Sequence, residues 1–247
     1  MIGVILAAGM AKRLRPLTDT KPKCLLKVGE RTLLERTVVA MAAAGISEFV
    51  VVTGYRADQI RDFLDNLVKP EFLGKPRFTY LHNADYEHNN NIYSLWMTRE
   101  FVRGREFLLL DSDILFDPEI IKRMLQEPGT ALALNRHELG EEEIKVIVDQ
   151  QNRVVEISKV CAISDAIGES VGIEKMDSTY SEALFAELDK MIEGEGLIDI
   201  FYERAFERLI PQGHLFHIVD TTDYFSIELD TVDDFNSARE LIPAELY

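Results

Sequence analysis

The first half of the chain alternates short apolar runs with stretches in which apolar residues recur at helical spacing. The apolar runs at residues 2–6, 48–53, 77–82 and 106–110 predict strands. The segments 32–44, 57–67, 91–102 and a segment from Pro118 predict helices. Such alternation is typical of a parallel sheet between layers of helices.

The second half has more strand signals in a less regular order. We expect strands at 130–135, 144–148, 154–158, 214–219 and 225–229, and helices at 181–192, at 198–209 and from Thr231. No linker rich in Gly, Ser or Pro divides the chain. We therefore predict one domain over residues 1–247 with an α/β fold, a Rossmann-like αβα sandwich with a mixed, mostly parallel sheet.

Composition narrows the classes of partner. The chain carries 43 acidic and 27 basic residues, a formal net charge of −16, which disfavours nucleic acid as a ligand. The apolar start, MIGVILAAG, lacks a basic leader and is too short to span a bilayer, so it predicts a buried first strand. Cys24 and Cys161 form no disulfide framework. We expect a cytoplasmic protein that binds no membrane. The composition leaves open whether the protein forms a homodimer.

One basic segment stands out against this acidity. Residues 12–27 contain six Lys or Arg and one Asp, a net charge of +5, so the rest of the chain carries −21. The segment follows a turn of small residues, Leu6-Ala7-Ala8-Gly9, in which Gly9 can take a positive φ. Pro16 and Pro22 brace the loop, and Lys23 precedes an apolar pair. A solvated basic loop is the alternative, but a nucleoside triphosphate held by backbone N–H groups and cations fits better.

Carboxylates follow two of the predicted strands. Asp111 and Asp113 come after the strand at 106–110, and Glu228 and Asp230 end the strand near 225–229. Such a set suits a hard divalent cation that bridges phosphate oxygens. Thr231 and Asp234 instead form a capping-box pattern, so both are left out of the predicted site.

The segment from Leu6 to Lys23 resembles the signature L-A-A-G-x-G-x-R-L-x-P-L-T-x-x-x-P-K of the nucleotidyltransferase (nucleotidyl phosphate pyrophosphorylase) superfamily. Ala11 departs from it by replacing the second glycine. The resemblance implies that backbone around Ala8 and Gly9 cradles the nucleotide. It also implies that Arg13 binds the β- and γ-phosphates and that Lys23 bridges the α-phosphate and the acceptor.

A mid-chain segment, HNADYEHNNNIYSLW, resembles the N-x-x-Y-x-x-x-N-N-x-x-S-L element of the phosphocholine cytidylyltransferase branch, which includes enzymes for other aminoalkyl phosphates and phosphonates. This resemblance implies CTP and a small phosphate or phosphonate as substrates, with Mg²⁺ as cofactor. From the change in the order of elements after about residue 130, we expect the nucleotide-binding half at about residues 1–130 and the acceptor-binding half at about 131–247. The base-contacting positions of the family fall at Gly54 and Tyr55, and its second phosphate-binding lysine at Lys159.

The resulting candidate site combines both lines of reasoning. Lys23 and Arg13 are the predicted catalytic residues, and Asp113 and Asp230 the predicted metal ligands. The remaining nucleotide contacts are Leu6, Ala7, Ala8, Gly9, Gly54, Asn83, Asn90, Ser94 and Asp111, and the acceptor contacts are Tyr86, Lys159, Glu169, Glu174 and Glu228. Further candidates for binding a cationic amine are Tyr93, Trp96, Tyr224 and Phe225; a packing role on a helix suits Trp96 better.

Several functions stay open at this point. One alternative is a sugar-1-phosphate or inositol-phosphate nucleotidyltransferase that uses CTP, UTP, dTTP or GTP. A glycosyltransferase would explain Asp111 and Asp113 as a D-x-D metal motif but leaves Arg13 and Lys23 without roles. A non-catalytic module of the same fold would commonly lack the lysine or the metal carboxylates. The acceptor, among phosphocholine, phosphoethanolamine and 2-aminoethylphosphonate, is not resolved by the residues.

Overall fold

The computed structural model describes residues 1–70, 72 and 75–246. At the centre of its main sheet lies β1 (Ile2–Ala7), whose six residues are all buried. It pairs in parallel with β4 (Glu48–Thr53) on one side and with β6 (Phe107–Asp111) on the other, and β5 (Arg77–His82) pairs in parallel with β4. The apolar run at the start of the chain is therefore a core strand, as the sequence predicts.

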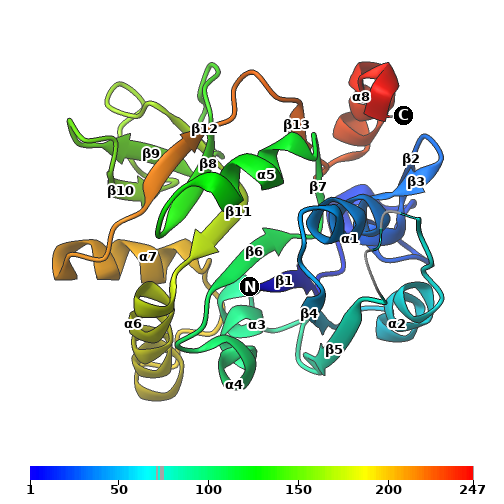
Figure 1. Ribbon diagram of the computed structural model, residues 1–247, viewed down its shortest axis with the longest axis horizontal. Helices are drawn as coiled ribbons and strands as arrows, with labels where there is room; N and C mark the ends of the chain where they lie inside the picture. The colour runs from blue at the N-terminus through cyan, green and yellow to red at the C-terminus, as the bar shows by residue number, and fades with distance from the viewer. Residues whose placement is uncertain (71, 73–74, 247) are drawn as a thin grey trace.

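A long strand, β11 (Gly168–Met176), runs antiparallel beside β6 and connects the two parts of the sheet (Figure 1). It also pairs antiparallel with β8 (Ala131–Asn135) and with β9 (Lys145–Val148). The sheet is completed by β10 (Val154–Ser158) beside β9 and by β12 (His217–Asp220) parallel to β8. Because β1, β4, β5, β6, β8 and β12 share one direction, the predicted mixed, mostly parallel sheet is confirmed.

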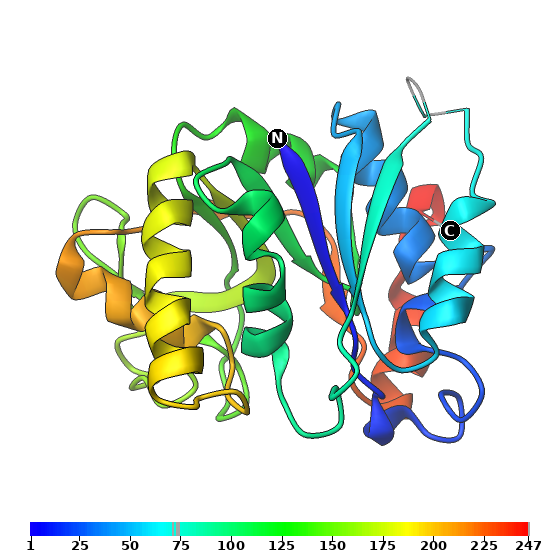
Figure 2. The ribbon, with the colours of Figure 1, turned by 90° about the horizontal axis from the view of Figure 1, so that it is seen from below.

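Helices cover both faces of this sheet, as Figure 2 shows. Alternate side chains of β1 point to opposite layers: Ile5 to one core and Val4 and Leu6 to the other. The first core is covered by α1 (Leu33–Ala43), α2 (Ala57–Asp65) and α5 (Glu119–Gln126). The second is covered by α3 (Asn91–Met97), α4 (Arg99–Val102), α6 (Ser178–Asp189) and α7 (Glu203–Leu209).

A third, smaller core brings the end of the chain to its beginning. It lies under α8 (Val232–Leu241), between the strand pair β7 (Ile114–Phe116) and β13 (Ser226–Glu228) and the short hairpin of β2 (Lys27–Val28) and β3 (Arg31–Thr32). Its buried residues include Leu14 from the loop after β1, Leu115 from β7 and Phe235 from α8. This packing positions the carboxylates near residue 230 against the basic loop near residue 13.

The sequence prediction misses one central strand. The polar residues of β11 conceal it, since Glu174 and Lys175 are buried in a strand that is covered on both sides. The helix expected over residues 91–102 is divided into α3 and α4 at Thr98, whose backbone N–H and side-chain hydroxyl both donate to the Leu95 carbonyl. Of the strands in the short pairs β2–β3 and β7–β13, the sequence predicts only β13, as the strand near 225–229.

Two helix boundaries also differ from the expected ones. The helix expected at 181–192 begins at Ser178, because Asp177 caps it by accepting a hydrogen bond from the Tyr180 N–H at 2.8 Å, and it continues into a π-helical turn over Lys190–Gly194. The helix expected at 198–209 begins only at Glu203.

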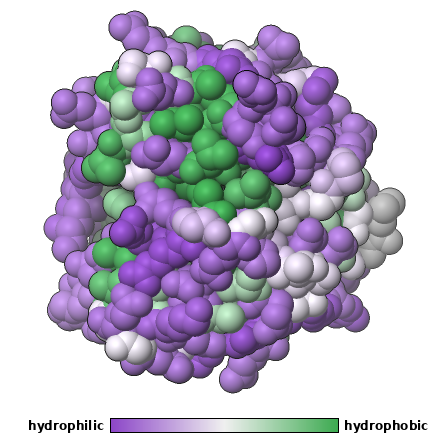
Figure 3. All heavy atoms as spheres, turned by 90° about the vertical axis from the view of Figure 1, so that its left-hand side faces the viewer, coloured by the Kyte–Doolittle hydropathy of each residue, from purple (hydrophilic) through white to green (hydrophobic). Residues whose placement is uncertain are grey.

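The surface beside β10 and α7, which Figure 3 shows face on, is mainly hydrophilic with one apolar patch. Val155 of β10 and Val160 in the following loop are exposed. Within residues 1–70, 72 and 75–246, no helix combines the length and the apolar character needed to cross a membrane.

Candidate active site

A cleft of about 870 Å³ opens where β1 and β6 end. It is lined by the turn Leu6-Ala7-Ala8-Gly9 after β1 and by the residues from Asp111 to Ile114 after β6. Open α/β sheets bind ligands at the carboxyl ends of their parallel strands, and a volume of roughly 300–1,000 Å³ is usual for a ligand site. The loops that follow β8, β10 and α6 close the opposite wall.

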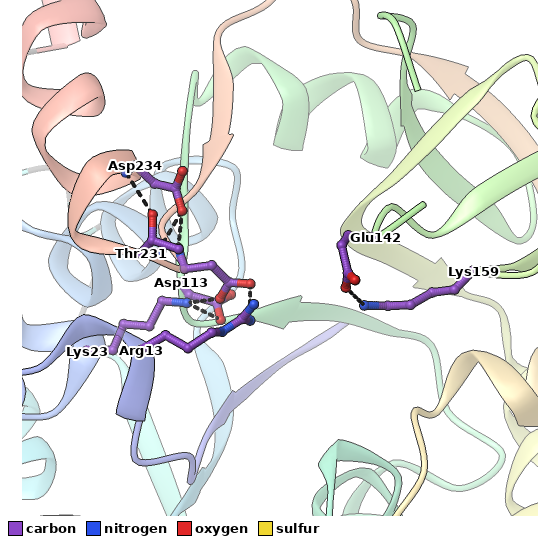
Figure 4. A network of polar contacts seen from close by, with 8 residues as sticks. Arg13, Lys23, Asp113, Glu142, Lys159, Thr231 and Asp234 are labelled. Carbon is purple, nitrogen blue, oxygen red and sulfur yellow. Dashed lines mark hydrogen bonds and ion pairs between the residues drawn. The ribbon is translucent and has the colours of Figure 1, made fainter. Parts of the chain in front are cut away.

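One end of the cleft, which we call the Lys23 end, contains Arg13, Lys23, Asp113, Glu228 and Asp230. Figure 4 shows Arg13, Lys23 and Asp113 close together there. Lys23 begins a short 3₁₀ turn over Lys23–Leu25 whose next two residues are buried. This anchoring leaves the lysine only 8% exposed, and its Nζ donates to Asp113 Oδ2 at 3.0 Å and to Asp230 Oδ1 at 2.7 Å. Arg13 forms a second ion pair with Asp230.

Backbone pairing sets the two aspartates side by side. Asp113 lies in the turn between β6 and β7, and β7 pairs antiparallel with β13, so that Glu228 faces Ile114 and the Leu229 N–H donates to the Asp113 carbonyl at 3.1 Å. Asp230 follows directly. Its N–H donates to Asp234 Oδ2 at 3.1 Å.

Thr231 and Asp234 form the predicted capping box at the start of α8. Because Asp234 also accepts the Asp230 N–H, the cap fixes the backbone of a predicted metal ligand.

The electrostatics of the Lys23 end follow from these contacts. Burial alone would lower the pKa of Lys23, but Asp113 and Asp230 together raise it above its ordinary value. Burial would raise the pKa of Asp230, yet Lys23 and Arg13 hold it below its usual range. Partial loss of solvation inside the cleft, followed by the charges of Asp113 and Asp230, raises the pKa of Glu228 to about 8, although its side chain is exposed. The end therefore holds a lysine and an aspartate that are both charged at neutral pH.

The same carboxylates fit a divalent cation. One oxygen from each of Asp113, Glu228 and Asp230 lies within 4.8 Å of the others, and Asp113 Oδ1 is buried without a hydrogen-bond partner among the described residues. Oxygen donors of this kind are the usual ligands of Mg²⁺ and Ca²⁺. Glu228, predicted to contact the acceptor, thus lies with the predicted metal ligands.

In the loop after β1, the residue with a left-handed backbone conformation is not the predicted one. Gly9 does not adopt a positive φ; a Cβ at Gly9 would have no atom within 4 Å, so the space beside it is open. Ala11, which replaces the family glycine, has φ 46° instead. The Thr18 hydroxyl donates to the Ala11 carbonyl at 2.9 Å and holds this conformation.

The mid-chain motif builds one wall of the cleft through amide hydrogen bonds. Asn83 Nδ2 donates to Asn89 Oδ1 at 2.7 Å and to Ser94 Oγ at 3.2 Å, which fixes the loop carrying Tyr86. Asn90 caps α3, and all five side chains line the cleft. Asn89 was not among the predicted contacts, although the NNN run contained it.

The opposite end, which we call the Lys159 end, contains His137, Glu142, Lys159, Glu169, Phe201 and Glu203. Lys159 Nζ lies 3.4 Å from Glu142 Oε2 and 5.0 Å from the centroid of the Phe201 ring. His137 Nε2 lies 2.8 Å from Glu169 Oε1. Figure 4 shows the Lys159–Glu142 pair facing the Lys23 end across the cleft.

A buried lysine supports the loop that carries Glu142. Lys145 is 1% exposed, and its Nζ donates to the backbone carbonyls of Gly140, Glu141 and Glu143 at 3.1–3.2 Å. A lysine ammonium has three N–H donors, and here each has an acceptor. The loop over residues 140–143 is therefore fixed from beneath.

Several predicted contacts are absent from the cleft lining, and for Glu174 the expectation is corrected. Glu174 is 0% exposed; Ser170 Oγ lies 3.1 Å and Tyr202 Oη 3.4 Å from its carboxylate oxygens, so it lies beneath the floor. Gly54 is absent from the cleft lining, because its missing Cβ makes room for Tyr86 and the Ala8 carbonyl. The additional amine-binding candidates Tyr93, Trp96, Tyr224 and Phe225 also lie outside the lining.

Two of these rings have other partners. The Trp96 indole donates to Asp189 at 2.9 Å, which supports its packing role, and the Tyr224 hydroxyl accepts from Arg123 at 2.7 Å.

Sequence reasoning missed Phe201 and Glu203. The segment that carries them is brought to the cleft by two tertiary contacts: the Tyr202 N–H donates to Asn91 Oδ1 and the Asn90 N–H donates to the Ile198 carbonyl, both at 2.9 Å. Tyr202 Oη also donates to Asp111 Oδ2 at 3.0 Å. No local pattern in the sequence signals these contacts.

A cleft at the ends of parallel strands, with cations facing metal-type carboxylates, is the arrangement of a nucleotidyltransferase. The chain belongs to the MobA-like NTP transferase domain family, whose model matches residues 3–208. The predicted superfamily is thereby confirmed.

Among similar proteins, the choline-phosphate cytidylyltransferase of Streptococcus pneumoniae is 24% identical over 246 residues, 99% of this chain and 100% of that protein. The CMP-5'-(3-aminopropyl)phosphonate synthase of Streptomyces rubellomurinus is 27% identical over 95% of this chain, which spans only 38% of that protein.

Solved structures support the fold. A structure of the CTP:phosphocholine cytidylyltransferase from Streptococcus pneumoniae has a TM-score of 0.81 at 20% identity, covering 98% of this chain and 99% of that one. A structure of the inositol-1-phosphate CTP transferase from T. maritima has a TM-score of 0.75 at 22% identity, covering 98% and 97% of the two chains.

Proposed function

We propose that this protein transfers a cytidylyl group from CTP to a small phosphate or phosphonate and releases pyrophosphate. The observation that carries the proposal is the Lys23 end, where two cations and three carboxylates from distant segments meet beyond β1 and β6. The choice of CTP is supported by the two relatives described above, each aligned over at least 95% of the chain, whose names specify cytidylyl or CMP chemistry.

The reaction needs positioning more than proton transfer. An oxygen of the acceptor phosphate or phosphonate attacks the α-phosphorus, and the bond to the β-phosphate breaks in line, so that pyrophosphate leaves. The open backbone beside Gly9 gives the triphosphate access, while Lys23 and Arg13 neutralise charge on the phosphate oxygens. Mg²⁺ held by Asp113 and Asp230, with Glu228 beside them, would supply further charge neutralisation and orient the phosphates.

The acceptor is proposed to bind toward the Lys159 end, in the second half of the chain. Lys159 offers a cation for the acceptor phosphate, and Glu169 and Glu203 offer carboxylates for an amine. The proposed nucleotide-binding and acceptor-binding halves are not strictly separate in sequence, because Glu228 and Asp230 come from the second half but lie at the Lys23 end.

A substrate matrix tests the proposal. The purified protein, with Mg²⁺, is offered CTP, UTP, dTTP, GTP and ATP against phosphocholine, phosphoethanolamine, 2-aminoethylphosphonate, inositol phosphate and sugar phosphates, and pyrophosphate is followed. We expect turnover with CTP and an aminoalkyl phosphate or phosphonate. Turnover confined to sugar phosphates with UTP, dTTP or GTP would replace the proposed substrates but keep the reaction class. Turnover with nucleoside diphosphate sugars, and no pyrophosphate, would indicate a glycosyltransferase.

A further inference from the structure

One carboxylate oxygen at the Lys159 end of the cleft has no hydrogen-bond partner among the described residues. Glu203 lies at the first residue of α7, lines the cleft and is 7% exposed. Its Oε2 is buried and has no hydrogen-bond partner within the described part of the chain. An uncompensated buried carboxylate oxygen costs free energy, and in a cleft the missing donor can be supplied by a bound ligand.

The neighbouring carboxylates are already satisfied. Glu142 pairs with Lys159, Glu169 pairs with His137, and Glu143 Oε2 accepts a hydrogen bond from the Gly140 N–H at 2.9 Å. Asp111 Oδ2 accepts from the Tyr202 hydroxyl. Glu203 is therefore the carboxylate of this wall that a bound cation would complete.

The aromatic surface of the cleft is small. Among the residues that the structure describes, the Phe, Tyr and Trp side chains that line the cleft are Phe201 and Tyr86. The Phe201 ring already has the Lys159 ammonium 5.0 Å from its centroid. Tyr86 packs over Gly54 and against the edge of Tyr55, on the Asn83 side of the cleft. A trimethylammonium group, which has no N–H donor, depends on such aromatic faces.

We propose that Glu203 binds the cationic end of the acceptor and that it selects an ammonium carrying N–H groups over a trimethylammonium. An N–H donor satisfies the free Glu203 oxygen, whereas a methyl group leaves it buried and unpaired. This inference rests on the proposed function and deepens it, because it names the amine class of the acceptor.

The test compares three acceptors that share one phosphate ester and differ only at the far end of the chain: phosphoethanolamine, phosphocholine and ethyl phosphate. With CTP and Mg²⁺, we expect kcat/KM for phosphoethanolamine to exceed that for phosphocholine at least about 10-fold. It should exceed that for ethyl phosphate at least about 30-fold. Equal or better use of phosphocholine would overturn the proposal, and this comparison needs no variant.

The variant Glu203→Gln separates binding from a structural role. It should lower kcat/KM for phosphoethanolamine about 30-fold, mainly through KM, and change ethyl phosphate less than about 3-fold. The control is Glu207→Gln on the same helix, since Glu207 pairs with Arg204 and lies outside the cleft lining.

Equal losses on phosphoethanolamine and ethyl phosphate would show that Glu203 acts through the fold or through Lys159, and would overturn the inference alone. If no phosphate or phosphonate acceptor yields pyrophosphate from CTP, the proposed function fails and the inference fails with it.

Discussion

At the Lys23 end of the cleft, cations and carboxylates face one another before any substrate arrives, whereas the Lys159 end has weaker pairs and one carboxylate left over. The Lys23 ammonium is buried between two aspartates. The Lys159–Glu142 pair is exposed, with 36% and 88% of the two side chains accessible, and exposed ion pairs contribute about 0–1 kcal/mol. Under the proposed function, the first end suits the polyanionic triphosphate, and the second suits the positively charged end of the acceptor.

Replacing the two lysines in turn tests this contrast most strongly. Lys23→Met should lower kcat about 10³-fold, because a buried donor aimed at developing charge is lost. Lys159→Met should cost only about 10-fold, since its ammonium is exposed and screened. Steady-state assays measure both, with Lys27→Met, an exposed lysine of the same segment, as the control. Equal losses at both lysines would remove the contrast between the ends.

The unpaired carboxylate makes a prediction about pH and stability. Burial raises the pKa of Glu203 from its ordinary 4.5 to about 7, so its ionisation opposes folding. This penalty is absent below about pH 4.5, grows as pH rises and is complete above about pH 7. Glu203→Gln should therefore change stability little at pH 5 and raise it by about 3 kcal/mol at pH 8.

Urea unfolding at the two pH values measures this difference, with Glu193→Gln, at an exposed position, as the control. If the variant changed the free energy of unfolding equally at both pH values, ionisation of Glu203 would not be what destabilises the folded protein.

The capping box gives a smaller effect at the Lys23 end. Asp234→Ala should cost about 1 kcal/mol of unfolding free energy, as loss of a helix cap does. It should also lower kcat a few-fold, because the Asp230 N–H loses its acceptor. Asp233→Ala, an exposed neighbour in the same helical turn, serves as the control. A stability loss with unchanged kcat would show that Asp230 is held by β13 alone.

The smallest change concerns the loop after β1. A left-handed non-glycine residue costs about 1–2 kcal/mol, while glycine gives up about 0.4–1 kcal/mol through the unfolded state. Ala11→Gly should therefore raise stability by about 0–1.6 kcal/mol in thermal unfolding. Ala40→Gly, inside α1, should lower it by about 1 kcal/mol. A loss of that size at Ala11 would place the residue outside the left-handed region.

The sequence predicts the Lys23 end well because its signals are local. The turn after β1, the braced loop to Lys23 and the two acidic strand ends are contiguous motifs, and parallel strands bring their ends to one edge of the sheet. The positions of Phe201 and Glu203 depend on hydrogen bonds between their segment and Asn90 and Asn91. These partners lie more than a hundred residues away in the sequence. The strand β11 was missed because its buried Glu174 and Lys175 break the apolar pattern on which strand prediction relies.

The three carbonyls that accept from Lys145 have a consequence for turnover. A loop beside a substrate ordinarily loses conformational freedom each time the substrate binds, and that loss weakens binding. Here the loop over residues 140–143 loses its freedom once, when the chain folds. The backbone that carries Glu142 is therefore already in place when a ligand enters the cleft, and little binding energy is spent on ordering it.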